Sequence, residues 1–185
     1  MPYVGLAVMV AVTLYIVGMY NGLVSLRNRV KNGWAQIDVQ LKRRYDLIPN
    51  LVEVAKGYMV HEQQTLEKVT QARQQAVNLS GTTDVVEQAR AENALSQTLR
   101  SLFAVAENYP ELRANQNMLQ LQEELTSTEN RIAFARQHYN DEVMRLNTRI
   151  ERFPESVVAG WLQVAREHFF EVEDSRHRDV PRVQF

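Results

Sequence analysis

Residues 118–153 read MLQLQEELTSTENRIAFARQHYNDEVMRLNTRIERF, and one stripe of positions recurs in them at every third or fourth residue. The stripe consists of Met118, Leu121, Leu125, Thr128, Ile132, Ala135, Tyr139, Val143, Leu146, Ile150 and Phe153. Such steps return to one face of an α-helix, so the stretch predicts one long amphipathic helix of about five heptads. Pro154 is expected to end it, because proline disfavours the helical conformation in the residue before it.

The same period occurs three more times earlier in the chain, over residues 23–48, 51–79 and 85–106. No strand-like alternation of any length appears before residue 170. The sequence therefore predicts an all-α fold in which residues 23–153 form an antiparallel four-helix bundle with long helices.

Residues that typically begin or end helices separate these segments. They are Pro49 with Asp46 before it, Ser80-Gly81, Asp84 with Glu87 three residues later, and Asn108-Tyr109-Pro110. Proline removes a backbone donor and is expected to interrupt the first helix, with Asp46 as a possible N-cap of the second. Glycine suits the left-handed conformation just past a helix end, and the aspartate–glutamate pair resembles a capping box at the next start.

The N-terminal segment, residues 1–22, is predicted to be a transmembrane anchor. No charged residue precedes Arg27, and Tyr3–Tyr20 is apolar apart from Gly5, Thr13 and Gly18. As a helix these residues cover roughly 27 Å, close to the hydrocarbon thickness of a bilayer. A buried core helix of this length would normally have a polar face, and a cleaved signal peptide would carry a basic start and a small-residue cleavage site.

Basic residues follow the apolar segment, whereas no lysine or arginine precedes it. The positive-inside rule then favours an N-terminus outside and a body in the cytoplasm. Candidate membrane-interface residues are Tyr20, Arg27, Arg29, Lys31 and Trp161.

Residues 154–185 are expected to form a short amphipathic helix and an extended tail. Val157, Val158, Trp161, Val164 and Ala165 fall on one side of this helix. The helix could lie in the membrane interface beside the anchor, or it could cap the open end of the bundle. The tail from residue 171 could be an ordered strap, a strand offered to a partner or a disordered segment.

The sequence carries no recognisable catalytic, cofactor or metal motif. It contains no cysteine, and its four histidines have neither Glu-x-x-His nor His-x-x-x-His spacing. The seven glycines form no phosphate-binding loop, and the formal net charge of −1 gives no global attraction to nucleic acid. The basic run Lys42-Arg43-Arg44 is interpreted as a solvated face or as pairing with acidic residues of the bundle. We expect no enzyme activity, cofactor, metal, nucleic acid or small-molecule substrate.

Several polar residues lie within the first and fourth predicted helices. They are Gln36, Asp38, Asn130, Arg131, Asn140 and Asn147. Because buried polar groups need hydrogen-bond partners, some of them are predicted to form a network between helices, for example Asp38 with Arg131.

Long stretches of the sequence are similar to the LemA family of bacterial membrane-anchored helical proteins. The matching residues include YNxLVxLRNRV at 20–30 (x for a residue outside the match), WAQIDVQLKRR at 34–44, DLIPNLVE at 46–53, YPEL at 109–112, LQLQEEL at 119–125 and ENRI at 129–132. Further matches are Ala135-Arg136, Tyr139-Asn140, Asn147-Thr148, Phe153-Pro154, Phe170-Glu171 and the ending Pro181-x-Val183-x-Phe185. The sequence departs most from the family pattern over Val157–His168.

This resemblance implies a single N-terminal span, a short external N-terminus and an antiparallel helical bundle, but no reaction. Some relatives help to build membrane organelles in magnetic bacteria, which favours scaffolding by analogy. The expected function is therefore a scaffold at the bacterial inner membrane that self-assembles or holds other membrane proteins. The alternatives are a membrane-tethered adaptor or sensor with a specific protein partner, and an enzyme whose site has no sequence motif.

Overall fold

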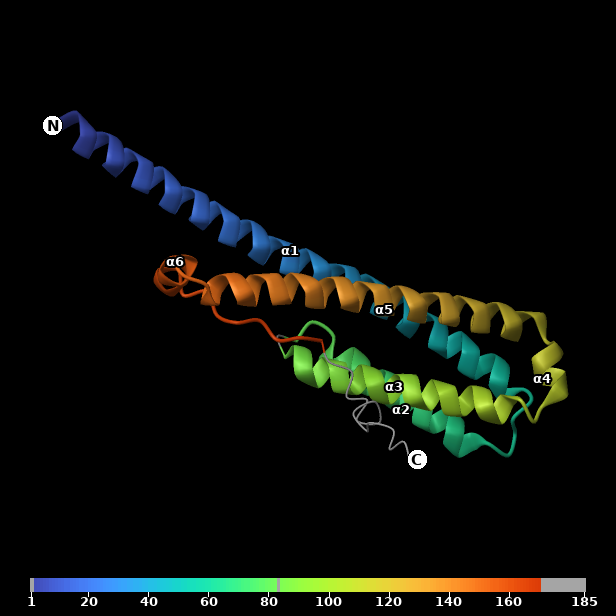
Figure 1. Ribbon diagram of the computed structural model, residues 1–185. Coiled ribbons are helices and arrows are strands. Elements are labelled where there is room, and N and C mark those ends of the chain that lie inside the picture. The colour runs from blue at the N-terminus through green and yellow to red at the C-terminus, as the bar shows by residue number, and fades with distance from the viewer. Residues whose placement is uncertain (1, 83, 171–185) are drawn as a thin grey trace, which may run out of the picture. The chain divides into compact units, whose positions relative to one another are not determined.

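The computed structural model describes residues 2–82 and 84–170, and within them all regular structure is helical, as predicted. The helices are α1 (Pro2–Lys56), α2 (Gln63–Leu79), α3 (Val85–Ala106), α4 (Pro110–Ala114), α5 (Gln116–Glu151) and α6 (Glu155–Trp161), labelled in Figure 1. The predicted tail from residue 171, with His177, lies outside the described residues. The described residues divide into two compact units: unit 1 is residues 2–39 with 132–169, and unit 2 is residues 40–82 and 84–131 with Phe170.

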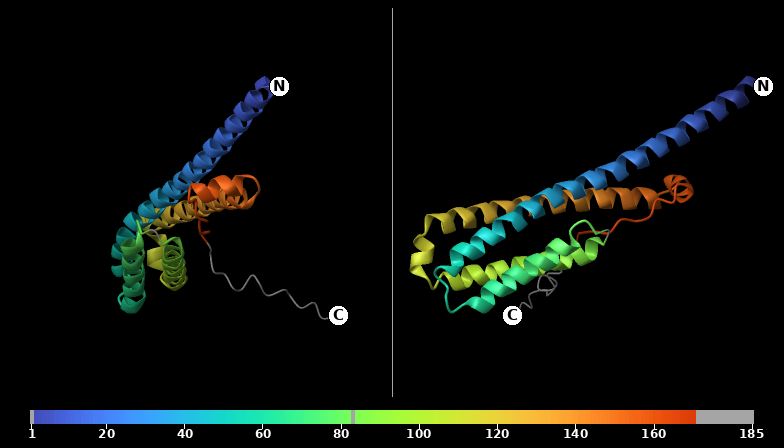
Figure 2. Two further views of the ribbon diagram at one scale, coloured as in Figure 1. Left: turned by 90° about the vertical axis from the view of Figure 1, so that its left-hand side faces the viewer. Right: turned by 180° about the vertical axis from the view of Figure 1, so that it is seen from behind.

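In unit 1, the first part of α1 is apolar and uncovered. Residues 3–18 are all exposed, including Leu6 at 60% and Leu14 at 66%. By length and composition, α1 is apolar enough over this part to cross a membrane. Figures 1 and 2 both show these turns extending past the end of α5 and past α6.

The core of unit 1 consists of the predicted stripes of α1 and α5. Its buried members are Leu23, Leu26, Val30, Ile37, Ile132, Ala135, Tyr139, Val143 and Leu146. The two helices approach each other closely at Gly33, where a Cβ atom would lie 3.3 Å from the Cα of Tyr139. The next residue, Trp34, packs edge-on against the Tyr139 ring, with 5.5 Å between ring centroids.

In unit 2, α2 and α3 form a helical hairpin, and its connection follows the sequence prediction. Gly81 has a φ of +84°, the left-handed conformation that glycine adopts without strain. Asp84 then caps α3, because its carboxylate accepts hydrogen bonds from the backbone N–H groups of Val86 (3.0 Å) and Glu87 (3.1 Å).

The predicted break at Pro49 is wrong, because α1 continues through this proline to Lys56. Asp46 therefore lies inside α1 and is no N-cap, and residues 51–55 belong to α1. Proline has no N–H to donate to the carbonyl oxygen of Tyr45, four residues earlier. The Nε of Arg73 on α2 donates to that oxygen at 2.7 Å. A tertiary hydrogen bond thus replaces the helical one, and the chain turns only at residues 57–62.

The break predicted at Asn108-Tyr109-Pro110 is present and contains the short helix α4, with Pro110 at its first position. The side chain of Asn115 accepts a hydrogen bond from the backbone N–H of Met118 at 3.1 Å, at the start of α5. The long helix α5 ends at Glu151, close to the predicted Pro154. The amphipathic helix after Pro154 is shorter than expected, since α6 ends at Trp161.

Candidate functional site

A buried ionic cluster lies at the centre of unit 2, around Arg44 of α1. The side chains of Arg44 and Glu92 are both 0% exposed, and the Arg44 Nη2 donates to the Glu92 carboxylate. The other terminal nitrogen, Nη1, donates to Glu129 at 2.7 Å and to the Ser96 hydroxyl at 2.9 Å. The Tyr45 hydroxyl donates to the second oxygen of Glu92. The buried charges are thus paired and hydrogen-bonded, as burial requires.

This cluster connects α1, α3 and α5 within unit 2. Both terminal nitrogens of Arg44 are engaged within it, whereas the buried Nε of Arg44 has no hydrogen-bond partner among the described residues. Sequence reasoning included Arg44 in a basic run and expected a solvated face or acidic partners. The pairing with acids is confirmed for Arg44 and also for Arg43, which lies 3.7 Å from Glu124 at the surface. Lys42 is exposed.

The glutamate partners were not identified from the sequence, although a signal for burial was present. Arg44 lies three residues after Leu41 and four before Ile48, on the apolar face of its helix. Glu92 occupies the same kind of position between Ala89 and Leu95. A charged residue on an apolar stripe indicates a buried ion pair, but it does not identify the partner.

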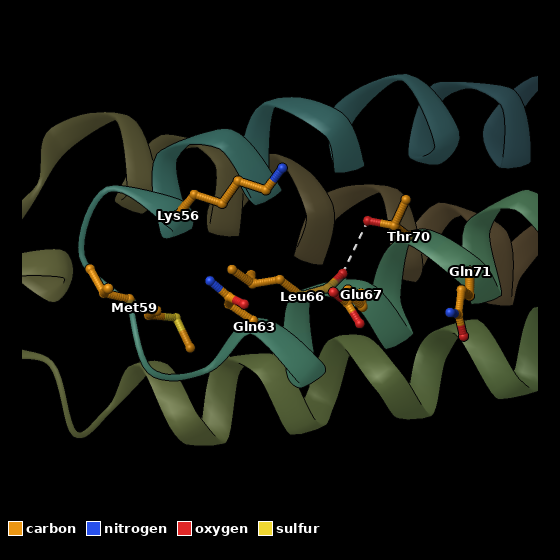
Figure 3. A pocket seen from close by; sticks show the side chains of 8 residues that line it. Lys56, Met59, Gln63, Leu66, Glu67, Thr70 and Gln71 are labelled. Carbon is orange, nitrogen blue, oxygen red and sulfur yellow. Dashed lines mark hydrogen bonds between the residues drawn. The ribbon is translucent and has the colours of Figure 1, made fainter.

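An open hollow of about 580 Å³ lies elsewhere in unit 2, between the end of α1 and the start of α2. Its walls come from Lys56, Met59, Val60, Gln63, Leu66, Glu67, Thr70 and Gln71 (Figure 3). The Thr70 hydroxyl is engaged, because it donates to the carbonyl oxygen of Leu66 at 3.0 Å. The hollow thus offers apolar surface from Met59, Val60 and Leu66 beside one cationic and one anionic side chain.

In unit 1, side chains of α5 form hydrogen bonds with the backbone of the segment that follows α6. The side-chain amide of Asn147 donates to the carbonyl oxygen of Glu167 (2.9 Å) and accepts from its N–H (3.0 Å). The Tyr139 hydroxyl donates to the carbonyl oxygen of His168 at 2.9 Å. Burial, together with the negative charge of Glu167, raises the pKa of Tyr139 to about 12. Tyr139 therefore remains a neutral donor throughout the physiological pH range.

The residues of the predicted polar network have different environments. Gln36, Asn130 and Arg131 are exposed, whereas Asp38, Asn140 and Asn147 are half-buried. Asn147 binds backbone groups after α6 rather than another long helix. The pairing of Asp38 with Arg131 stays a prediction.

The candidate membrane-interface residues are all exposed. Tyr20 is at the end of the apolar segment, and Arg27, Arg29 and Lys31 follow on α1. Trp161 is on α6, which packs against the end of the apolar segment through Val158 and Ala159. Within residues 2–82 and 84–170, no group of three or more histidine, aspartate and glutamate side chains is arranged to hold a metal ion.

Comparison with known proteins identifies one family. A sequence model of the LemA family matches residues 33–185 of this chain. Protein LemA of Metamycoplasma hominis is 28% identical over 164 residues, which cover 89% of this chain and 74% of that protein. The similarity thus extends over both units and the C-terminal segment.

Proposed function

The chain belongs to the LemA family, and from this premise we propose that it is a non-enzymatic, membrane-anchored scaffold of the bacterial inner membrane. It assembles with copies of itself or holds other membrane proteins at the bilayer. The antiparallel four-helix bundle predicted from the sequence is part of this proposal, and so is a topology with the N-terminus outside and the helical body in the cytoplasm.

The observation that carries the proposal is the continuity of α1. Its first turns expose an uncharged and mainly apolar surface, which is unfavourable in water and favourable in a bilayer. The same helix then supplies Leu23, Leu26 and Val30 to the core of unit 1 and Leu41 and Ile48 to the core of unit 2. One continuous helix thus carries the apolar segment and also contributes residues to both cores. This continuity supports a role in holding the folded body at the membrane.

An exposed aromatic side chain on α5 suggests where copies would meet. Phe134 is 75% exposed, and aromatic side chains are enriched in protein–protein interfaces. We expect the full-length protein in mild detergent to be a defined oligomer when its mass is measured by light scattering. Phe134→Ser should reduce that mass, whereas Gln137→Ser, at another exposed position of α5, should not. A wild-type monomer would contradict self-assembly.

The alternative is a membrane-tethered adaptor or sensor, and the hollow of unit 2 is the observation that favours it. Val60 at its wall is 63% exposed and could contact an apolar side chain of a partner. This function predicts a monomer in detergent and a specific crosslink to one protein from a photoreactive residue at position 60. Crosslinks to the same chain would support self-assembly.

The topology can be tested directly because the chain contains no cysteine. A single cysteine at the exposed position Gln137 should react with a membrane-impermeant maleimide only after the cells are lysed. Labelling of intact spheroplasts would place the body outside and contradict the proposed topology.

A further inference from the structure

Helix α6 packs against α1 at the point where the apolar segment ends. Val158 and Ala159 of α6 form a small buried cluster with Met19 and Leu23 of α1. The apolar segment ends at Tyr20, so these contacts lie at the level where hydrocarbon gives way to lipid headgroups if α1 spans the bilayer. α6 is thereby located beside the membrane boundary.

The opposite side of α6 exposes large apolar side chains. Trp161 is 82% exposed and Val157, one turn earlier, is 52% exposed. Phe153, just before α6, is 78% exposed. This exposed surface is close to the lipid-facing part of α1, and tryptophan is enriched at membrane–water interfaces because its ring is apolar and its N–H is polar.

Arginine side chains lie at the same level. The guanidinium of Arg149 lies against Gly22, where a Cβ atom would be 2.9 Å from its Nη2. Gly22 is two residues, about 3 Å along the helix, beyond Tyr20, which is within a headgroup layer several ångströms thick. Arg149 also contacts Glu155 at 3.4 Å, and Arg152 is exposed.

These arginines line a hollow of about 560 Å³ in unit 1. Its walls are Leu26, Met144, Arg145, Thr148, Arg149, Arg152 and Glu155. Arg145 is paired with Glu142 at 2.8 Å and Arg149 more distantly with Glu155 at 3.4 Å, so Arg152 and then Arg149 are the arginines of this hollow best placed to attract an anion. Arg27 and Arg29 of α1 add exposed positive charge just beyond.

From this juxtaposition we infer that α6 and the adjoining arginines form a surface that binds acidic phospholipids. Val157, Trp161 and Phe153 enter the interface, while Arg149 and Arg152 bind the phosphate of an anionic headgroup. The inference rests on the proposed anchoring, because α6 reaches lipid only if α1 spans the bilayer. A membrane matches this protein surface. The apolar side chains of the surface adjoin the lipid-facing part of α1 and its cations lie at headgroup depth, as hydrocarbon and anionic headgroups do in a bilayer interface.

Tryptophan fluorescence can test the inference, since the chain has two tryptophans. The full-length Trp34→Phe variant, reconstituted into vesicles, leaves Trp161 as the only indole and keeps an aromatic ring against Tyr139. In vesicles with acidic phosphatidylglycerol, Trp161 should emit at the short wavelength of a desolvated indole and be quenched by brominated acyl chains. The Trp161→Phe protein is the control, because Trp34 is about 21 Å along α1 beyond Tyr20 and should escape quenching.

The contribution of charge is measured by comparing acidic with neutral phosphatidylcholine vesicles. Each basic residue near an anionic surface strengthens docking about fivefold, so Arg149→Gln and Arg152→Gln should each lower the docked-to-undocked ratio by about that factor in acidic vesicles. Arg90→Gln, at an exposed position in unit 2, should have no effect. Exchange of chloride for inorganic phosphate at equal ionic strength should leave quenching unchanged; loss of quenching would indicate a site for free phosphate and overturn the lipid assignment.

Flotation of the vesicles distinguishes membrane anchoring through α1 from lipid binding by α6. Protein that floats with the vesicles and resists carbonate extraction, but whose Trp161 stays water-exposed and unquenched, would overturn the inference and leave the anchor intact. Protein that fails to float would overturn both the inference and the anchored function. Quenching that is equal in acidic and neutral vesicles would overturn the role of the arginines.

Discussion

Replacing Arg44 by alanine removes the cation from the buried cluster of unit 2. The Glu92 carboxyl group would then lose its ion-pair partner in a site where its side chain is 0% exposed. The Tyr45 hydroxyl would remain as its hydrogen-bond donor. Glu129 is 40% exposed and can recover solvation, so most of the penalty is expected at Glu92.

The magnitude follows from this difference in burial. Removing one partner of a buried ion pair costs about 3–5 kcal/mol, because the remaining charge is left without compensation. For a chain of this length such a loss lowers the melting temperature by about 6–20 °C. The neighbouring pair Arg43–Glu124 has side chains 49% and 50% exposed, and a pair of this kind contributes less than about 1 kcal/mol.

Arg43→Ala is therefore the matched control, since it deletes the same side chain one residue away. Both variants would be unfolded in detergent by heat and by urea, with helicity followed by circular dichroism. The double variant Arg44→Met, Glu92→Leu should be more stable than Arg44→Ala, because it leaves no unpaired charge at Glu92. If Arg44→Ala unfolded at the same midpoint as Arg43→Ala, the assignment of a buried, energetically coupled cluster would be refuted.

Three further predictions concern other contacts. The pKa of Tyr139 is raised to about 12, so its neutral form stabilises unit 1 fully below pH 10, and this contribution is lost between pH 10 and 12. The difference in unfolding free energy between wild type and Tyr139→Phe should therefore shrink across that range in parallel urea titrations. Gly33→Leu should cost about 1–3 kcal/mol by overpacking against Tyr139, whereas Gly5→Leu, in open space, should leave the melting temperature unchanged. Arg73→Met should cost about 1–3 kcal/mol by removing the donor that replaces the N–H missing at Pro49, and the cost should fall in a Pro49→Ala background; equal costs in both backgrounds would contradict this role of Arg73.

Local rules located much of the secondary structure. The apolar period, Gly81 and Asp84 act through contacts within a few residues, so their consequences could be predicted without coordinates. The helix break predicted at Pro49 came from a local rule of the same kind, but this prediction was wrong. The reason is that Arg73, 24 residues later, donates a hydrogen bond to the Tyr45 carbonyl oxygen, to which proline has no N–H to donate.

The candidate sites depended even more on contacts between distant residues. Arg44 and Glu129 are 85 residues apart, and nothing in the local sequence of either identifies the other. Trp161 was proposed as an interface residue from its amphipathic segment alone. The packing of Val158 and Ala159 on Met19 and Leu23 is what puts it beside the end of the apolar segment.

The sequence alone thus determined the helical class of this protein, the apolar segment at its N-terminus and its resemblance to the LemA family. These features arise from periodicity, composition and local capping, which depend on neighbours along the chain. Only the tertiary structure decided which charges are buried together, where α1 ends and what α6 packs against. Those outcomes depend on side chains that meet through folding, where burial makes an ion pair, a hydrogen bond or an apolar contact energetically decisive.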